Sequence, residues 1–161
     1  MAYPIINKVE LNDTVKNLLR SKETIKVLAT TDKSGKVHAV FKGSISVNDA
    51  GNITLIEVLE SSQTNRNLTH AIWFNQHVSV LLKDGDGSSY QIKGIPYADH
   101  TVGPEYEEVY KNLIARNPDA DVAGYWEIIP DEVRLETFKD RLEEEIKTLP
   151  ILGHADKDFI G

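Results

Sequence analysis

A run of hydroxyl and amide side chains, "SSQTNRNL" at residues 61–68, carries the strongest chemical signal in this sequence. The apolar helical pattern "THAIWF" follows it, and Arg66 is the only charge in the run. A helix N-terminus presents free N–H groups and a partial positive charge, which suit a phosphate group. Side-chain donors would come from Ser61, Ser62, Thr64, Asn65 and Asn67. The run therefore fits either a phosphate-binding loop or a solvated helix start with Ser62 as its N-cap.

Other motifs give no support to metal or nucleophilic catalysis. "DGDGSS" at residues 84–89 resembles the start of a calcium loop, but Ser89 replaces the required glycine and Ile95 the final acid. The segment is therefore predicted to be a hairpin turn. No Gly-x-Ser-x-Gly elbow, P-loop or Rossmann fingerprint occurs in the sequence. We therefore expect no catalytic triad.

The five histidines do not form a metal set in the sequence pattern. His70 and His77 are seven residues apart, so they would lie roughly 10 Å from each other even on one continuous helix. His38 lies in an alternating strand pattern, which is more typical of a surface or lining residue than of a ligand. We predict no metal site.

Composition limits the class of protein and its partners. A chain of 161 residues with 40% hydrophobic content can form one domain with a real core. The net charge of −7 argues against nucleic acid as a partner, because phosphate backbones require a basic surface. No apolar run reaches the roughly 20 residues of a membrane span, and no secretory signal is visible. The absence of cysteine excludes disulfides and fits a cytoplasmic protein.

The hydrophobic pattern predicts short strands interrupted by helices. Strands are expected at 25–32, 36–47, 53–60, 77–84 and 90–98, with a last strand or strand pair at 124–138 broken at Pro130. Helices are expected at 12–20, from the polar run to about residue 74, at 103–117 and at 139–149. This order favours a mainly β protein, a small antiparallel barrel, over βαβ units. We expect one domain at 1–138 and an appendage at 139–161, whose helix looks polar nearly all round.

Several of these segments, taken in order, resemble the pyridoxamine 5′-phosphate oxidase-related family of FMN-binding split-barrel proteins. The resemblance covers residues 25–138 and is carried by "VLATTDKSGKVHAV", "SQTNRNL", "NQHVSVLL", "YQIKGIPYA" and "YWEIIPDEVRLETF". It implies a six-stranded antiparallel split barrel, with flanking helices and a C-terminal helical tail, that forms a homodimer with sites at the subunit interface. Small one-domain FMN-binding members look most similar.

The resemblance also implies an FMN site drawn from several segments. Its residues would be Val40, Phe41, Lys42 and Gly43 along the ring and ribityl chain, Ile56, Glu57 and Val58 beside the ring, Ser61, Ser62, Gln63, Thr64 and Asn67 at the phosphate, Gln91 at the ring edge, and Trp126 from the second subunit. Two of these have an alternative: Glu57 as an outward-facing strand residue, and Trp126 as a core residue. The loop cation common in the family falls on Gln63 or Thr64, so Arg66 or Lys42 would replace it.

Three functional hypotheses follow. The first is an FMN-dependent oxidoreductase or flavin electron carrier with a small-molecule electron donor or acceptor, in which the cofactor supplies the chemistry. The chain is short and lacks a C-terminal basic cluster, so pyridoxamine phosphate oxidase activity itself is not expected. The second is a non-catalytic split-barrel module that holds FMN, haem or another ligand, with His38, His77 or His100 as a haem ligand. The third is a structural dimer with an empty pocket.

Overall fold

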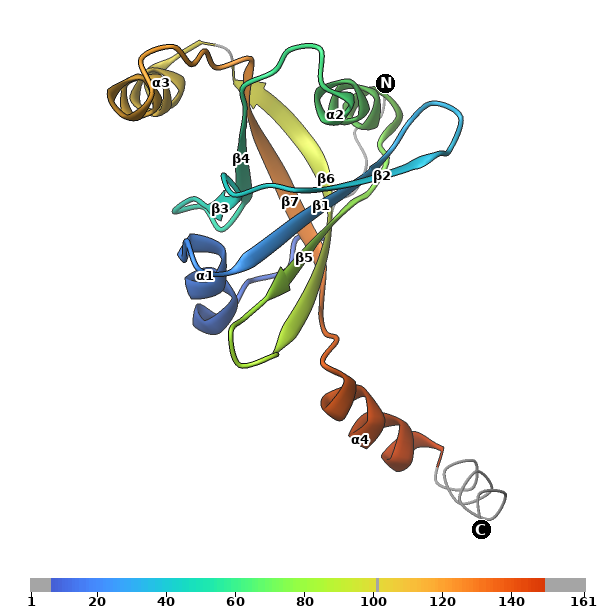
Figure 1. Cartoon of the computed structure of the whole chain (residues 1–161). Helices are drawn as coiled ribbons and strands as arrows, with labels where there is room; N and C mark the ends of the chain where they lie inside the picture. The colour runs from blue at the N-terminus through green and yellow to red at the C-terminus, as the bar shows by residue number, and fades with distance from the viewer. Residues whose placement is uncertain (1–6, 101, 150–161) are drawn as a thin grey trace.

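The computed structural model describes residues 7–100 and 102–149. In these ranges the chain forms four helices and one seven-stranded antiparallel sheet of order β2-β1-β5-β6-β7-β4-β3, which curls into a half-barrel (Figure 1). The elements are α1 (Asp13–Arg20), β1 (Ile25–Thr31), β2 (Val37–Phe41), β3 (Ser46–Val47), β4 (Ile53–Glu57), α2 (Gln63–Phe74), β5 (Val78–Lys83), β6 (Ser89–His100), α3 (Pro104–Arg116), β7 (Gly124–Leu135) and α4 (Phe138–Thr148). The expected mainly β split barrel with flanking helices is confirmed.

The sheet has seven strands instead of six because the segment expected as one strand at 36–47 is divided. A turn at residues 42–45 separates β2 from β3. Lys42 N–H still donates to the Lys26 carbonyl on β1 at 3.0 Å, whereas β3 pairs with β4. One continuous segment therefore begins at one edge of the sheet and ends at the other.

Ser44 connects the two edges of the sheet through its side chain. Its hydroxyl donates to the Ile56 carbonyl at 2.9 Å and accepts from the Ile56 N–H at 3.1 Å. The side chain thus takes the place of a backbone partner for β4 where strand pairing is interrupted. Because backbone groups away from water require partners, this contact helps to close the barrel.

Lys26 supports the same region from inside the barrel. Its ammonium donates to the carbonyls of Leu19 at 2.6 Å and Ile45 at 2.8 Å, and the residue is only 5% exposed. One side chain thereby links α1, β1 and the turn between β2 and β3. Burial disfavours the charged form, so the pKa of Lys26 is lowered from its ordinary value.

The expected break at Pro130 is absent, since β7 is continuous through it. Pro130 lies opposite Gly94 of β6, at a register shift between Lys93 and Gly94. A proline cannot donate to a ladder, and such residues occur at bulges. A Cβ on Gly94 would lie 2.5 Å from the carbonyl oxygen of Ile129, so only glycine allows the two strands to approach this closely.

The core fills the concave side of the sheet. Asn12 caps α1 by accepting from Val15 N–H, and the helix buries Val15, Leu18 and Leu19. Further buried core side chains include Leu28, Leu55, Leu68, Leu82, Ile92, Trp126 and Ile128. Among the residues described, no helix combines the length and apolarity needed to cross a membrane.

Helix α4 extends away from the barrel (Figure 1). Phe138, Leu142 and Ile146 are four residues apart and therefore share one face, and they are 79%, 41% and 47% exposed. The expectation of a helix polar nearly all round is wrong, because these three side chains form an apolar face. The acids at 143–145 lie on the other faces of the helix. The predicted domain boundary at 138/139 stays a prediction.

Candidate functional site

The ends of β2 and β4 meet at an ion pair between two of the predicted residues. Lys42 Nζ lies 2.6 Å from a carboxylate oxygen of Glu57, whose other oxygen accepts from Leu59 N–H at 3.2 Å. Glu57 is only 2% exposed, so the alternative of an outward-facing residue is wrong. The pair compensates a buried charge, and it leaves Lys42 engaged within the protein.

The polar run forms the start of α2, as the sequence predicts. Ser62 is the N-cap, and its hydroxyl oxygen accepts from Asn65 N–H at 3.0 Å. Because the first intrahelical bond runs from Arg66 N–H to the Ser62 carbonyl, the N–H groups of Gln63 and Thr64 precede the helical ladder. Such N–H groups have no carbonyl partner within the helix.

Two side chains of the run hold the helix in place. Asn67 is buried and donates to Thr30 Oγ1 on β1 at 2.9 Å, while Gln63 donates to Asn67 Oδ1 at 2.7 Å. Asn65 accepts from the Trp126 indole N–H at 3.2 Å. Trp126 is 1% exposed and lies in the hydrophobic core of the chain. This position matches the core alternative and corrects the expectation that Trp126 reaches a partner's flavin.

A hollow of about 390 Å³ lies beside the first two turns of α2. This α2 hollow is lined by Asp32, Lys33, Gln63, Arg66, Asn67 and His70. Two of these residues are cations, and Asp32 is the only acid. The Ser34 hydroxyl, the Lys36 and Ser34 N–H groups and the charge of Lys36 hold the pKa of Asp32 below its usual value, and the three hydrogen bonds all go to its Oδ1. The described lining therefore carries two cations and one acid, with the amide side chains of Gln63 and Asn67 beside them.

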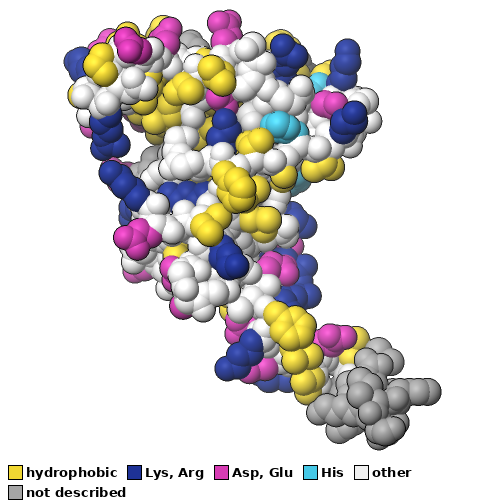
Figure 2. Space-filling view, viewed as in Figure 1, with side chains coloured by type: hydrophobic (Ala, Val, Ile, Leu, Met, Phe, Trp, Pro, Cys, Tyr) yellow, Lys and Arg dark blue, Asp and Glu magenta, His cyan; other side chains and the backbone are white. Residues whose placement is uncertain are grey.

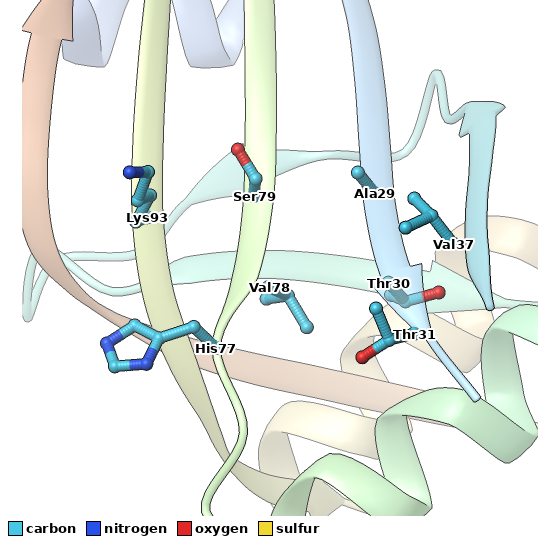
Figure 3. Close-up of a pocket in the computed structure, with 8 residues that line it drawn as sticks. All are labelled: Ala29, Thr30, Thr31, Val37, His77, Val78, Ser79 and Lys93. Atoms are coloured by element: carbon cyan, nitrogen blue, oxygen red, sulfur yellow. The ribbon is translucent and has the colours of Figure 1, made fainter. Parts of the chain in front are cut away.

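A second hollow, of about 230 Å³, lies on the convex face of the sheet (Figure 3). This sheet-face hollow is lined by Ala29, Thr30, Thr31, Val37, His77, Val78, Ser79 and Lys93. Ala29, Ser79 and Lys93 are direct neighbours on β1, β5 and β6, and the Ser79 hydroxyl is buried without a partner among the described residues. Thr30, which bonds Asn67, joins this hollow to the α2 hollow.

The remaining predicted residues differ in their exposure, and one of them, Gln91, lies far from the end of β2. Phe41, Gly43, Val58 and Ser61 are exposed, Val40 and Ile56 are half-buried, and Thr64 is buried. Gln91 is separated from Phe41 by β1 and β5, in the row Phe41–Val27–Leu81–Gln91. Three strand spacings of about 4.8 Å place it roughly 14 Å away. The structure therefore does not bring Gln91 to the end of β2.

Sequence reasoning missed Lys33, His70 and Lys93 as lining residues of the two hollows, and it named His77 only as a candidate haem ligand. Lys33 lies in a turn that reads as solvated, and Lys93 alternates with buried residues on β6 like any outward-facing side chain. The clue that was available for Lys93 is its neighbour Gly94, which marks a bulge in the strand.

The fold is shared with solved structures of very different sequence. HupZ from group A Streptococcus superposes with a TM-score of 0.65 at 18% identity, over 80% of this chain and 95% of that one. An FMN-binding protein from Syntrophomonas wolfei gives 0.55 at 13% identity, over 76% and 84%. HutZ, the haem storage protein from Vibrio cholerae, gives 0.55 at 14% identity, over 79% and 95%.

Pyridoxamine 5′-phosphate oxidase-like proteins are also among the structures that match. No family model and no curated protein matches this sequence. The structural likeness confirms that the chain has the split-barrel fold of the pyridoxamine 5′-phosphate oxidase-like and FMN-binding proteins.

Proposed function

We propose that this chain, which has the fold of the FMN-binding split-barrel proteins, binds FMN and works as a flavin-dependent oxidoreductase or electron carrier. The observation that carries the proposal is the α2 hollow. In a chain of net charge −7, it brings Lys33, Arg66 and His70 together with the amide side chains of Gln63 and Asn67, and Asp32 is the acid among its described lining residues. Such a site favours an anion of the size of a phosphate monoester.

The donors of the α2 hollow fit this group. Arg66 can make a two-pronged contact to phosphate oxygens and takes the role of the loop cation, since Lys42 is paired with Glu57. Ser62 is not among the described lining residues, but it precedes Gln63 directly, and its hydroxyl hydrogen remains to donate because its oxygen accepts the capping bond. Bound FMN would supply the electron transfer chemistry. The residues of the chain would bind the phosphate and orient the flavin.

The same proposal includes a homodimer. The convex face of β2, β1 and β5 exposes Val37, Phe41, Ile25 and Leu81, which are 68%, 78%, 51% and 40% exposed. Figure 2 shows hydrophobic side chains gathered where these strands cross. A contiguous apolar patch of this kind marks an interaction surface. A second copy placed on this face would cover the sheet-face hollow and exclude water from it.

The test is a visible absorption spectrum of the purified protein, followed by titration with FMN. We expect a yellow protein, or FMN binding by the colourless one, and an Arg66→Ala variant that binds about 10-fold to 100-fold more weakly. Arg116→Ala, which removes an exposed arginine from α3, is the matched control. A protein that neither retains nor takes up FMN would contradict the proposal.

Haem is a second candidate because HutZ, which matches in fold, is a haem storage protein. Of the three histidines considered as ligands, His77 lines the sheet-face hollow, where its Nε2 contacts Asp131. A Soret band after addition of haem, lost in His77→Ala and kept in His38→Ala, would favour this function over FMN. The absence of cysteine is consistent with our proposal that either function operates in the cytoplasm.

A further inference from the structure

Three ligand-type side chains from different elements converge outside the two hollows. His100 ends β6, Glu105 lies in the first turn of α3, and Glu127 lies on β7. Each offers a ligand atom that is within 4.8 Å of the other two. A mixed set of one imidazole and two carboxylates is suited to a divalent transition-metal ion.

Glu127 is fixed in place before any ion arrives. The residue is 5% exposed, and its two carboxylate oxygens accept from the side-chain amides of Asn48 at 3.0 Å and Asn52 at 3.2 Å. Asn48 is itself held, because its side-chain oxygen accepts from Asn52 N–H at 2.9 Å. Neutral amides orient the carboxylate but do not neutralise its charge. A nearby cation would stabilise a buried carboxylate held in this way.

His100 presents an unpartnered nitrogen to this carboxylate. Its Nε2 is buried from solvent, has no hydrogen-bond partner among the described residues, and lies 3.5 Å from Glu127 Oε1. The ring also contacts Tyr125, with ring centres 5.7 Å apart. With metal–ligand bonds near 2.1 Å, two ligands of a tetrahedral ion lie about 3.4 Å apart. The observed separation is long for a hydrogen bond but suits two ligands of one ion.

We propose that His100, Glu105 and Glu127 bind one divalent transition-metal ion, with zinc as the reference case. Asn48 and Asn52 orient Glu127, as hydrogen-bonded neighbours of metal ligands do in known sites. Three protein ligands leave a fourth position of a tetrahedral ion open to water or a small ligand. The proposal is independent of FMN binding, since none of these residues lines either hollow.

The competing arrangement is an ion pair between protonated His100 and Glu127, with Glu105 simply solvated. It makes a different prediction, because an ion pair involves no Glu105 and binds no metal. Isothermal titration of the chelator-treated full chain with ZnCl₂, and the visible spectrum with CoCl₂, separate the two.

We expect one Zn²⁺ per chain and an intense tetrahedral-type Co²⁺ spectrum. Glu105→Gln and His100→Ala should each weaken Zn²⁺ binding at least tenfold. Glu107→Gln, an exposed acid on the same helix, and His38→Ala should leave it unchanged. Because Glu105 is exposed, its variant keeps the fold, and retained FMN binding in it would separate this site from the flavin site. No Zn²⁺ binding, or binding that survives His100→Ala, would overturn the proposal.

Discussion

Single charged residues carry much of the internal organisation of this protein. Lys26 and the Lys42–Glu57 pair lie where an apolar side chain would be expected, and each joins segments distant in sequence. Each buried charge is acceptable because its hydrogen bonds are made within the protein. Their substitution should therefore affect stability more than a surface change does.

Replacing Lys26 with methionine tests this at one position. The change removes the donor for the Leu19 and Ile45 carbonyls, so we expect a loss of roughly 2 kcal/mol or more in the free energy of unfolding. Urea denaturation at neutral pH measures it. Lys16→Met, at a half-buried position on α1, is the control.

The pH dependence of stability provides a second check on Lys26. Because its folded-state pKa is lowered from 10.5, the unfolded chain binds the proton more tightly between the two values. The free energy of unfolding of the wild type should therefore increase as the pH rises from the folded-state pKa to the unfolded-state pKa of Lys26. The Lys26→Met variant should lack it, and equal slopes in both proteins would contradict the lowered pKa.

At this scale the sequence predicts single-residue roles only where the partner is local. The Ser62 cap was foreseen because its acceptor role is satisfied three residues away. The partner of Glu57 could not be foreseen, since Lys42 lies fifteen residues earlier, in the turn after β2, a strand that β4 does not pair with. The polar types in the run were correctly noted, but the hydrogen bonds of Asn65 to Trp126 and of Asn67 to Thr30 could not be foreseen.

At the scale of elements, the barrel depends on two irregularities. One is the turn that divides β2 from β3, where Ser44 bonds Ile56. The other is the close approach of β6 and β7 at Gly94 and Pro130. Regular strand pairing alone would leave the sheet flatter, because bulges increase bending and twist.

Gly94→Ala should strain the second irregularity. The new methyl group would meet the Ile129 carbonyl oxygen at 2.5 Å and a methyl of Ile128 at 2.8 Å, so the strands must separate. We expect a loss of about 1–3 kcal/mol or more, read from thermal unfolding. Gly85→Ala, where nothing lies within 4 Å of the new group, should be close to neutral. Equal stability of the two variants would contradict the close packing.

Ser44→Ala tests the first irregularity. It leaves both backbone groups of Ile56 without their hydroxyl partner, so we expect a loss of about 1–3 kcal/mol. Hydrogen exchange should show faster exchange at the Ile56 amide, with the β5–β6 pairs unaffected. Ser46→Ala is the control, and unchanged Ile56 exchange would show that Ser44 does not close the barrel.

Elements were the level at which sequence reasoning worked best. Period-two alternation placed the strands, and the turn signals "KSG", "NDAGN" and "GDGSS" separated them. Sequence reasoning failed at the two irregularities because each depends on a partner from another strand. Continuous alternation hid the turn after Phe41, and Pro130 looked like a break because its glycine partner lies on another strand.

At the scale of the whole molecule, a single chain exposes two apolar surfaces to solvent. One is the convex face of β2, β1 and β5. The other is the apolar face of α4 formed by Phe138, Leu142 and Ile146, and no described residue covers either surface. The apolar face of α4 was not foreseen, because only three of its eleven residues are apolar and its composition is mostly charged. Likewise, no spacing could predict His100, Glu105 and Glu127 as neighbours, since separate elements bring them together.

Phe41→Asp should disrupt the proposed homodimer. A charge placed at the centre of an apolar interface must lose its water, which costs several kcal/mol when no partner is present. Light scattering after size-exclusion chromatography should show a dimer for the wild type and a monomer for the variant. Val102→Asp, a side chain of similar exposure away from this face, should leave the dimer intact. A wild-type monomer would contradict the assembly.

The order of strands in the sheet also affects how the protein is made on the ribosome. β4 emerges early, but apart from the two-residue β3 its only neighbour is β7. At ~5–20 residues per second, the stretch from Glu57 to Gly124 takes roughly 3–13 s to translate. During that interval Ile53 and Leu55 have no sheet partner to cover them, so the nascent chain offers an early binding site to chaperones.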